Sequence, residues 1–313
     1  MQPSALRPRF ILAAALAALA TPAMADAKVV VTIKPLHALV AAVMAGTGAP
    51  DLLVQGAASA HTYSLKPSDA SKLNKADVVF RMSGTMEAFT AKLANTLPKS
   101  VQVVTLQSAR GLKLLPRRTS ATFEQDDRDH KHGHGHSHDH DTMDGHAWLD
   151  PVNAKVIVDR IVQVLSAKDS ANTAAFRSNG ETLKAKLDEI TAELQRELAP
   201  VAKTPFILFH DALQYFERRF GLRAVGSISV NPDVPPSAQR LSTLRKRIIS
   251  LGAVCVMAEP QFDPRLVTNL VEGTRARTGT ADPEGAKIEP GPDLYFTLLR
   301  NLARDLKACL AAA

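Results

Sequence analysis

The sequence has only two cysteines in 313 residues, and it has no apolar run of 18 or more residues. So few cysteines exclude a small disulfide-rich scaffold, and the short apolar runs argue against a helix that spans a bilayer. The His-Glu-x-x-His signature of zinc proteases is also missing. What remains, 45% hydrophobic and 22% charged, is the composition of an ordinary globular protein whose length predicts about two domains.

The N-terminus has the pattern of a secretory signal peptide. Arg7 and Arg9 precede the apolar run Phe10–Leu19, and a small-residue triplet ends at Ala25. The apolar run is too short to span a bilayer, so a short membrane anchor is the weaker alternative. We therefore predict a signal peptide over residues 1–25, cleaved after Ala25, and a soluble exported protein located in the periplasm.

The two cysteines, Cys255 and Cys309, are expected to form a disulfide, because an oxidising compartment favours a bond over free thiols. Two buried thiols are the alternative. The bond would pin the C-terminal helix to a buried strand. Closing a loop of this length stabilises the fold by roughly 4 kcal/mol in the chain-entropy description.

The formal net charge is +7, but residues 124–144 carry seven acids against two bases. Export and the lack of a clustered basic and aromatic stripe argue against nucleic-acid binding. The same acidic insert has a histidine at every second position: His130, His132, His134, His136, His138 and His140. Short histidine-rich tracts bind metals, so we expect accessory, weaker metal sites here, with a dispensable solvated loop as the alternative.

Strand-like and helical segments alternate on both sides of this insert. We expect strands near 28–33, 51–54, 76–80, 101–106, 206–209, 224–228 and 254–258, and helices near 36–44, 68–73, 86–97, 151–165, 173–198, 212–219, 238–250, 264–277 and 294–310. This alternation predicts βαβ units and parallel sheets. The predicted fold class is α/β: two lobes, each a parallel β-sheet flanked by helices, joined by one long rigid helix.

The lobe boundaries follow from the longest helical pattern. Apolar residues recur there at steps of three and four, which lines one helix face: Leu183, Leu187, Ile190, Leu194 and Leu198. We place an N-terminal lobe at residues 26–165, including the histidine-rich loop at about 120–144. The linking helix follows at 166–200, and a C-terminal lobe occupies 201–313.

Three histidines outside the insert lie at the ends of expected elements. His61 lies in a loop of small residues, His146 directly precedes a helix, and His210 ends a strand. Open α/β sheets bind ligands at the carboxyl ends of their strands, and three imidazoles with a fourth group suit tetrahedral zinc. Each histidine alone is more often structural, and the spacing by itself defines no motif.

Several segments, taken in order, make the assignment more specific. They are Thr32-Ile-Lys-Pro-Leu-His, Ala60-His-Thr-Tyr-Ser-Leu-Lys-Pro-Ser-Asp, Asp144-Gly-His-Ala-Trp-Leu-Asp-Pro, Phe209-His-Asp-Ala-Leu-Gln-Tyr-Phe, Ala258-Glu-Pro-Gln-Phe and Asp282-Pro-Glu-Gly. Together they resemble the ZnuA-type family, the zinc-binding solute-binding proteins of ABC transporters. The resemblance extends over residues 28–310, and the insert lies where that family has its histidine-rich loop.

The resemblance implies that His61, His146 and His210 bind Zn²⁺ in the cleft between the lobes. Manganese-binding relatives place a carboxylate where His210 stands, so histidine favours zinc, and a manganese-binding protein of the same family is the alternative. Some zinc-binding members have Glu before the first histidine, where this chain has Ala60. The fourth ligand is therefore expected to be Asp282 or water.

The resemblance also implies a function other than catalysis. We expect a binding protein that captures zinc and delivers it to a membrane ABC permease, as a monomer, with a periplasmic metal chaperone as a possible further partner of the insert. Glu259 is expected either to hydrogen-bond a ligand histidine or to cap a helix. A periplasmic zinc hydrolase is the competing function, because three histidines with an open fourth position also fit a catalytic site.

Overall fold

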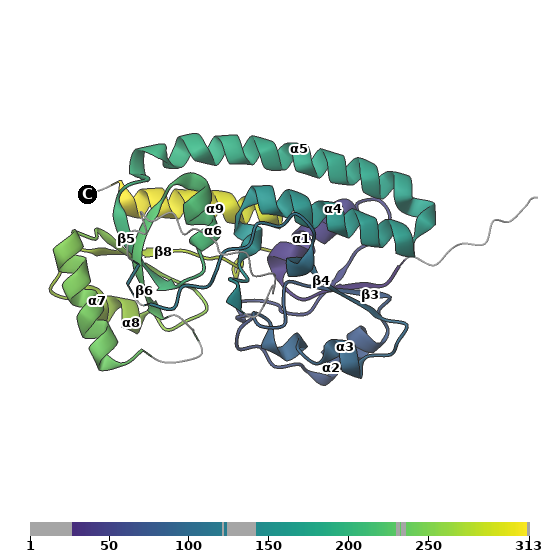
Figure 1. The fold of residues 1–313 in the computed structure, drawn as a ribbon, viewed down its shortest axis with the longest axis horizontal. Helices are drawn as coiled ribbons and strands as arrows, with labels where there is room; N and C mark the ends of the chain where they lie inside the picture. The colour runs from purple at the N-terminus through teal and green to yellow at the C-terminus, as the bar shows by residue number, and fades with distance from the viewer. Residues whose placement is uncertain (1–26, 121, 124–141, 230–231, 233–235, 312–313) are drawn as a thin grey trace, which may run out of the picture.

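The computed structural model describes residues 27–120, 122–123, 142–229, 232 and 236–311. They form two α/β lobes that lie side by side along one long helix, α5 (Thr173–Leu198) (Figure 1). The predicted signal peptide and the six histidines of the insert lie outside the described residues. Within the described ranges, no helix is both long enough and apolar enough to cross a membrane.

Each lobe is built on a four-stranded parallel sheet, which confirms the predicted fold class. The N-terminal sheet has the order β2-β1-β3-β4 and the C-terminal sheet the order β6-β5-β7-β8. The strands are β1 (Val29–Val31), β2 (Asp51–Leu52), β3 (Val78–Arg81), β4 (Gln102–Thr105), β5 (Pro205–His210), β6 (Arg223–Ser229), β7 (Cys255–Ala258) and β8 (Arg277–Thr280).

Alternate residues of the central strands enter different cores, as expected for strands that are covered on both faces. In β1, Val29 belongs to the core shared with α5, whereas Val30 belongs to a smaller core on the outer face. In β5, Phe206 and Ile207 divide in the same way. Helices therefore cover both faces of each sheet.

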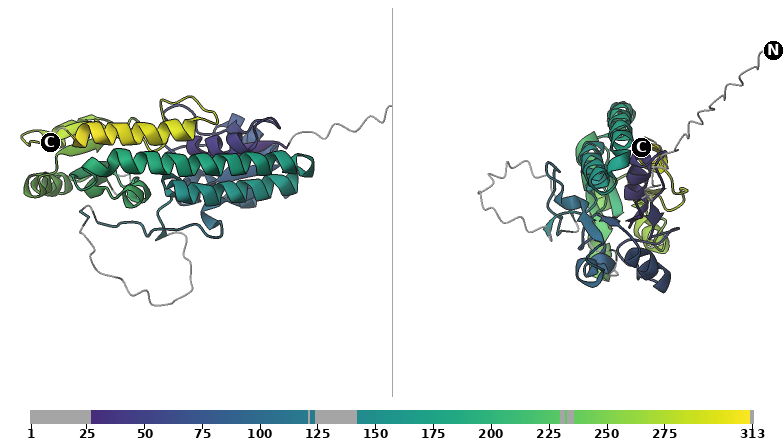
Figure 2. Two further views of the ribbon diagram at one scale, coloured as in Figure 1. Left: turned by 90° about the horizontal axis from the view of Figure 1, so that it is seen from above. Right: turned by 90° about the vertical axis from the view of Figure 1, so that its right-hand side faces the viewer.

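The helices divide between outer layers and a central layer. The outer faces are covered by α2 (Pro67–Asn74) and α3 (Leu93–Thr96) in the N-terminal lobe and by α7 (Ala238–Leu251) and α8 (Arg265–Val271) in the C-terminal lobe. The central layer consists of α1 (Lys34–Val43), α4 (Pro151–Lys168), α5, α6 (Gln214–Phe220) and α9 (Leu294–Leu310). Figure 2 shows α9 running beside part of α5, on the side of the C-terminal lobe. One continuous apolar core thus extends through both lobes.

The long helix α5 lies close to α4. A methyl group on Gly180 would come within 2.7 Å of Cγ2 of Val162, so this position has to be glycine for the two helices to pack. The helix α5 covers the range 173–198 that the helical pattern predicted. The preceding helix α4 extends to Lys168, and the Asp169 carboxylate accepts the backbone N–H of Asn172 at 3.3 Å. That short cap separates α4 from α5.

The C-terminal lobe contains a strand that the sequence pattern did not predict. We expected one helix over 264–277, but α8 ends at Val271, and Gly273 has a φ of +74° that turns the chain. The edge strand β8 follows. A methyl group on Gly279 in this strand would lie 2.8 Å from the Met257 sulfur and 2.9 Å from that of Cys309, so only glycine fits here.

The predicted disulfide is confirmed. Cys255 on β7 and Cys309 on α9 are bonded, with a Cα–Cα distance of 6.0 Å that is ordinary for a disulfide. The bond ties the last helix to the centre of the C-terminal sheet.

Candidate metal centre

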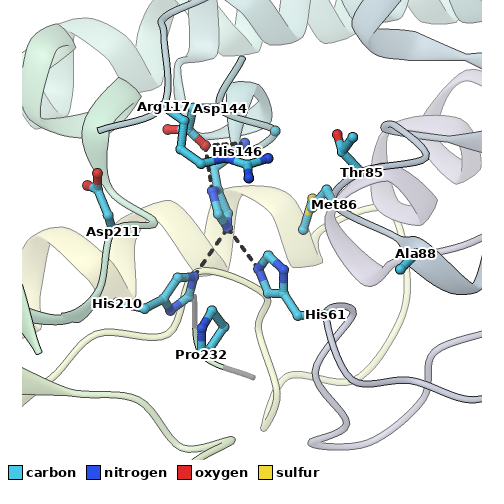
Figure 3. A pocket seen from close by; sticks show the side chains of 11 residues that line it. His61, Thr85, Met86, Ala88, Arg117, Asp144, His146, His210, Asp211 and Pro232 are labelled. Atoms are coloured by element: carbon cyan, nitrogen blue, oxygen red, sulfur yellow. Dashed lines mark hydrogen bonds and ion pairs between the residues drawn. The ribbon is translucent and has the colours of Figure 1, made fainter. Parts of the chain in front are cut away.

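The three predicted histidines meet in the cleft between the lobes (Figure 3). His61 comes from the loop between β2 and α2, His146 directly precedes α4 and its short 3₁₀ turn, and His210 is the last residue of β5. The Nε2 atom of His146 lies 3.4 Å from that of His61 and 3.3 Å from that of His210. Residues from both lobes therefore converge on one point.

These nitrogen separations match a tetrahedral zinc site. Two imidazole nitrogens bound to zinc at about 2.05 Å and at the tetrahedral angle lie about 3.3 Å apart. The observed distances of 3.3 and 3.4 Å agree with that value. His146 therefore lies at the spacing of a zinc site from both other histidines, and the three ligand atoms all lie within 4.8 Å of one another.

Carboxylates fix the orientation of two of the three rings. Asp144 Oδ1 lies 2.7 Å from Nδ1 of His146, and Glu259 Oε1 lies 2.6 Å from Nδ1 of His210. Each carboxylate also accepts the backbone N–H of its histidine, at 3.0 and 3.2 Å respectively. An Nδ1–H donated to a carboxylate leaves the Nε2 lone pair directed at the metal. Of the two roles considered for Glu259, the geometry matches the hydrogen bond to a histidine.

His61 differs from the other two rings. It is the only one of the three that is partly exposed, and its backbone N–H bonds the Ser59 hydroxyl at 3.3 Å. Burial lowers the pKa of His61 well below its usual value, and the neighbouring His210 and His146 lower it further. Burial also lowers the pKa of His210, but the Glu259 carboxylate outweighs it and raises that pKa. His61 is thus held in the neutral, metal-binding form.

Asp282, the predicted fourth ligand, is not part of this cluster of nitrogens. Its carboxylate builds a turn: Oδ1 accepts the backbone N–H of Gly285 at 2.9 Å, and Oδ2 accepts that of Ala286 at 2.6 Å. The side-chain amide of Gln261 also donates to Oδ1, at 3.1 Å. In this structure these bonds occupy both oxygens of Asp282, and its role as a ligand stays a prediction.

The sequence pattern did not single out Glu284, which lies two residues further on. This carboxylate is 6% exposed and accepts the backbone N–H of Ala60, next to His61, at 3.3 Å. Burial raises the pKa of Glu284 to about 8, while the bond from Ala60 and the charge of His210 oppose the rise. In the sequence, Glu284 could have been found only as the glutamate of the Asp282-Pro-Glu-Gly segment, from which we selected Asp282 as the candidate ligand.

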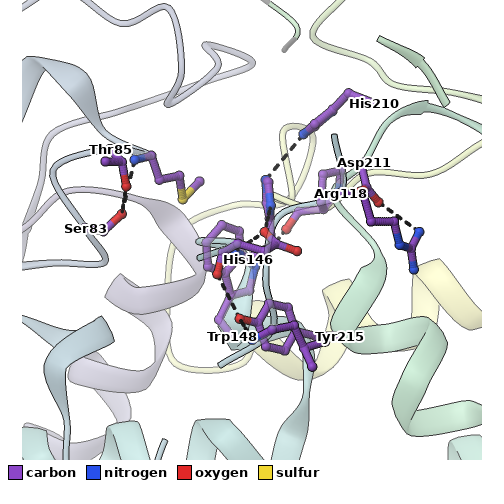
Figure 4. A network of polar contacts seen from close by, with 12 residues as sticks. Ser83, Thr85, Arg118, His146, Trp148, His210, Asp211 and Tyr215 are labelled. Atoms are coloured by element: carbon purple, nitrogen blue, oxygen red, sulfur yellow. Dashed lines mark hydrogen bonds and ion pairs between the residues drawn. The ribbon is translucent and has the colours of Figure 1, made fainter. Parts of the chain in front are cut away.

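A second group missed in the sequence is Arg118, which precedes the histidine-rich insert (Figure 4). Its guanidinium donates to Asp211 Oδ1 and to Glu217 Oε2, each at 3.1 Å. Burial raises the pKa of Asp211 to about 7, and the charge of Arg118 limits that rise. Because Asp211 follows His210, Arg118 ties the chain before the insert to the base of the metal centre.

A cavity of about 110 Å³ opens beside the histidines. Its walls include Thr85, Met86 and Ala88 on the N-terminal side and Asp211 and Pro232 on the C-terminal side. A cavity of this size can hold an ion and its immediate ligands.

Comparison with known proteins identifies the family. A family model described as zinc-uptake complex component A, periplasmic, matches residues 29–309. The chain belongs to this ZnuA family. The high-affinity zinc uptake system protein ZnuA of Brucella suis is 46% identical over 90% of this chain and 91% of its own length. ZnuA of Haemophilus ducreyi is 35% identical over 94% and 97%.

Solved structures show the same fold. A crystal structure of ZnuA superposes with a TM-score of 0.74 at 22% identity, covering 91% of this chain and 99% of that chain. The laminin-binding adhesin Lmb of Streptococcus agalactiae reaches a TM-score of 0.75 at 23% identity with the same coverage. The ZnuA family consists of periplasmic binding components of uptake systems, so the hydrolase hypothesis is set aside.

Proposed function

We propose that this protein captures Zn²⁺ in the periplasm through His61, His146 and His210 and delivers it to a membrane ABC permease. The observation that carries the proposal is the spacing of the three Nε2 atoms, at 3.3 and 3.4 Å, which suits tetrahedral zinc. The zinc uptake systems named for its relatives support the same cargo.

The donor set also favours zinc over manganese. Imidazole nitrogens suit zinc, whereas manganese prefers carboxylate and water oxygens. In this chain the last residue of β5 is His210, and the Glu259 carboxylate accepts a hydrogen bond from its ring. The manganese alternative therefore lacks the oxygen ligand at His210 that the resemblance leads us to expect.

The decisive experiment measures zinc binding by competition with a chromophoric chelator. We expect one tight site in the wild-type protein that zinc fills in preference to manganese, and we expect His146→Ala to abolish it. His37→Gln is the matched control, because the His37 ring is buried outside the cluster and bonds the Pro50 carbonyl at 3.0 Å. Tight zinc binding that survives His146→Ala would refute the site.

The remaining details stay proposals. Asp282 or water completes the coordination, and an Asp282→Ala variant with unchanged zinc affinity would eliminate Asp282. The six histidines of the insert, the monomeric state and a metal chaperone as a partner remain predictions from the sequence.

A further inference from the structure

The loop Asp282–Ile288, between β8 and α9, belongs to the C-terminal lobe but is hydrogen-bonded by residues of the N-terminal lobe. Lys34, the first residue of α1, is only 6% exposed and lies across the lobe boundary. Its Nζ donates to the carbonyl oxygens of Gly285 at 3.1 Å, Ala286 at 2.9 Å and Ile288 at 3.0 Å. An ammonium group has three N–H donors, so this lysine is fully satisfied by one loop.

Two more contacts from the N-terminal lobe reach the same loop. The backbone N–H of Ala60 donates to Glu284, and the indole N–H of Trp148 donates to the Pro283 carbonyl at 3.1 Å. Ala60 directly precedes His61, and Trp148 follows His146 by two residues. The loop is therefore held beside both histidines of the N-terminal lobe.

The loop can transmit position because it is internally braced. The Asp282 carboxylate accepts three successive backbone N–H groups, those of Glu284, Gly285 and Ala286. Gln261, two residues after Glu259, donates to the same carboxylate. The chain of contacts thus runs from Lys34 through the braced loop to the segment that orients His210.

The distances within the metal centre depend on how the lobes sit. His61 and His146 come from one lobe and His210 from the other, so a shift of the lobes changes the distances to His210 and leaves the His61–His146 distance alone. A buried ammonium is costly unless its partners are well placed, and three backbone carbonyls meet that condition here.

We propose that Lys34 is a positioning residue of the metal centre: by clasping the loop Asp282–Ile288 it fixes the spacing of His210 from the two histidines of the N-terminal lobe, without contacting the ion. The proposal rests on the function proposed above. It assigns to this lysine a role in metal affinity rather than in folding alone.

The test is Lys34→Met, which keeps an unbranched side chain, one atom shorter than that of lysine, and removes the three donors. We expect zinc affinity to fall about tenfold through faster release. We also expect the visible absorption of bound Co²⁺ to weaken, because the four-coordinate geometry loosens. The matched control is Lys184→Met, which removes an ion pair with Asp159 at 2.7 Å between α5 and α4, far from the loop in sequence. The control should change neither readout.

A double variant separates positioning from general stabilisation. In a His210→Ala background, Lys34→Met should have no further effect on residual zinc affinity, since the spacing it controls no longer matters. If Lys34→Met does not fold, Lys34→Gln, which retains the two N–H donors of an amide on a shorter side chain, replaces it, with an expected loss of at least threefold. A folded variant with unchanged zinc affinity and an unchanged Co²⁺ spectrum overturns the proposal. If His210→Ala itself leaves zinc affinity unchanged, the proposed function fails instead.

Discussion

The two sheets have the same strand order, yet only the C-terminal one has a strand that ends in a histidine of the candidate metal centre. The strands β1 and β5 occupy the same place in their sheets, next to β3 and β7 respectively. At the carboxyl end of each lies a polar residue that hydrogen-bonds a glutamate located after the neighbouring strand β3 or β7. The pair is Thr32 and Glu87 in the N-terminal lobe and His210 and Glu259 in the C-terminal lobe. One structural position therefore serves two purposes.

The difference between the pairs lies in what surrounds them. Thr32 and Glu87 are completely buried, and the Glu87 carboxylate also accepts the backbone N–H groups of Met82 and Ser83, at 2.6 and 2.9 Å. That pair closes the end of the sheet. His210 instead lines the cavity, while the two histidines of the N-terminal lobe come from loops. The two positions match in topology, and they differ in residue type and in contact with the cavity, which of these two residues only His210 lines.

The largest expected effect comes from exchanging the two strand-end residues in turn. His210→Ala should lower zinc affinity by more than about 100-fold, because the loss of a ligand exceeds the 10- to 100-fold cost of losing a ligand's hydrogen-bond partner. Thr32→Val, at the matching position, should leave the affinity within about threefold. Chelator competition measures both zinc affinities, and an equal loss of affinity in the two variants would contradict the proposed difference between the lobes.

The glutamates sharpen the same comparison. Glu259→Gln should reduce zinc affinity about 10- to 100-fold, because the neutral amide no longer holds the His210 ring with its Nε2 lone pair toward the ion. Glu87→Gln should leave zinc affinity nearly unchanged. Isothermal titration calorimetry with buffered zinc gives both values, and a loss confined to Glu87→Gln would reverse the assignment.

The smallest effect concerns stability rather than binding. Burial, opposed by the bonds from Thr32, Ser83 and Met82 and the charge of Arg81, raises the pKa of Glu87 to about 7. Above the usual pKa of glutamate the unfolded chain loses this proton first, so the folded state binds more protons and stability falls as pH rises toward 7.

Between pH 5.5 and 6.5 this group should lower the free energy of unfolding of the metal-free protein by about 1 kcal/mol. Denaturant titrations at the two pH values measure the change, and Glu87→Gln should reduce the drop by that amount. An identical pH dependence in the variant and the wild type would show that Glu87 titrates normally.

The sequence pattern predicted the features of the fold that depend on neighbouring residues, such as individual helices and the ends of strands. The spacing of Leu183 and its companions gave α5, and the end of a strand placed Glu259 beside His210 because parallel strands end at one edge. The prediction of one helix over 264–277 was wrong, because we followed the helical spacing of apolar residues past Gly273, where the chain turns.

The contacts between lobes were beyond such patterns. Lys34 bonds carbonyls more than 250 residues away, and Arg118 bonds Glu217 across 99 residues. Nothing in the neighbouring sequence of either residue indicates a distant partner. The same limit applies to Asp282, whose role as a ligand stays a prediction: the sequence shows a carboxylate in the Asp-Pro-Glu-Gly segment but not the backbone N–H groups that donate to it.

The apolar core that runs through both lobes bears on how a permease could distinguish the loaded protein. Separating the lobes as rigid halves would expose this core around α5 and α9 to water, at a cost that grows with each square ångström uncovered. We therefore expect the loaded and empty proteins to have nearly the same outline. Recognition by the transporter would then depend on the few loops around the ion, above all the loop of His61, whose ring donates to no carboxylate among the described residues.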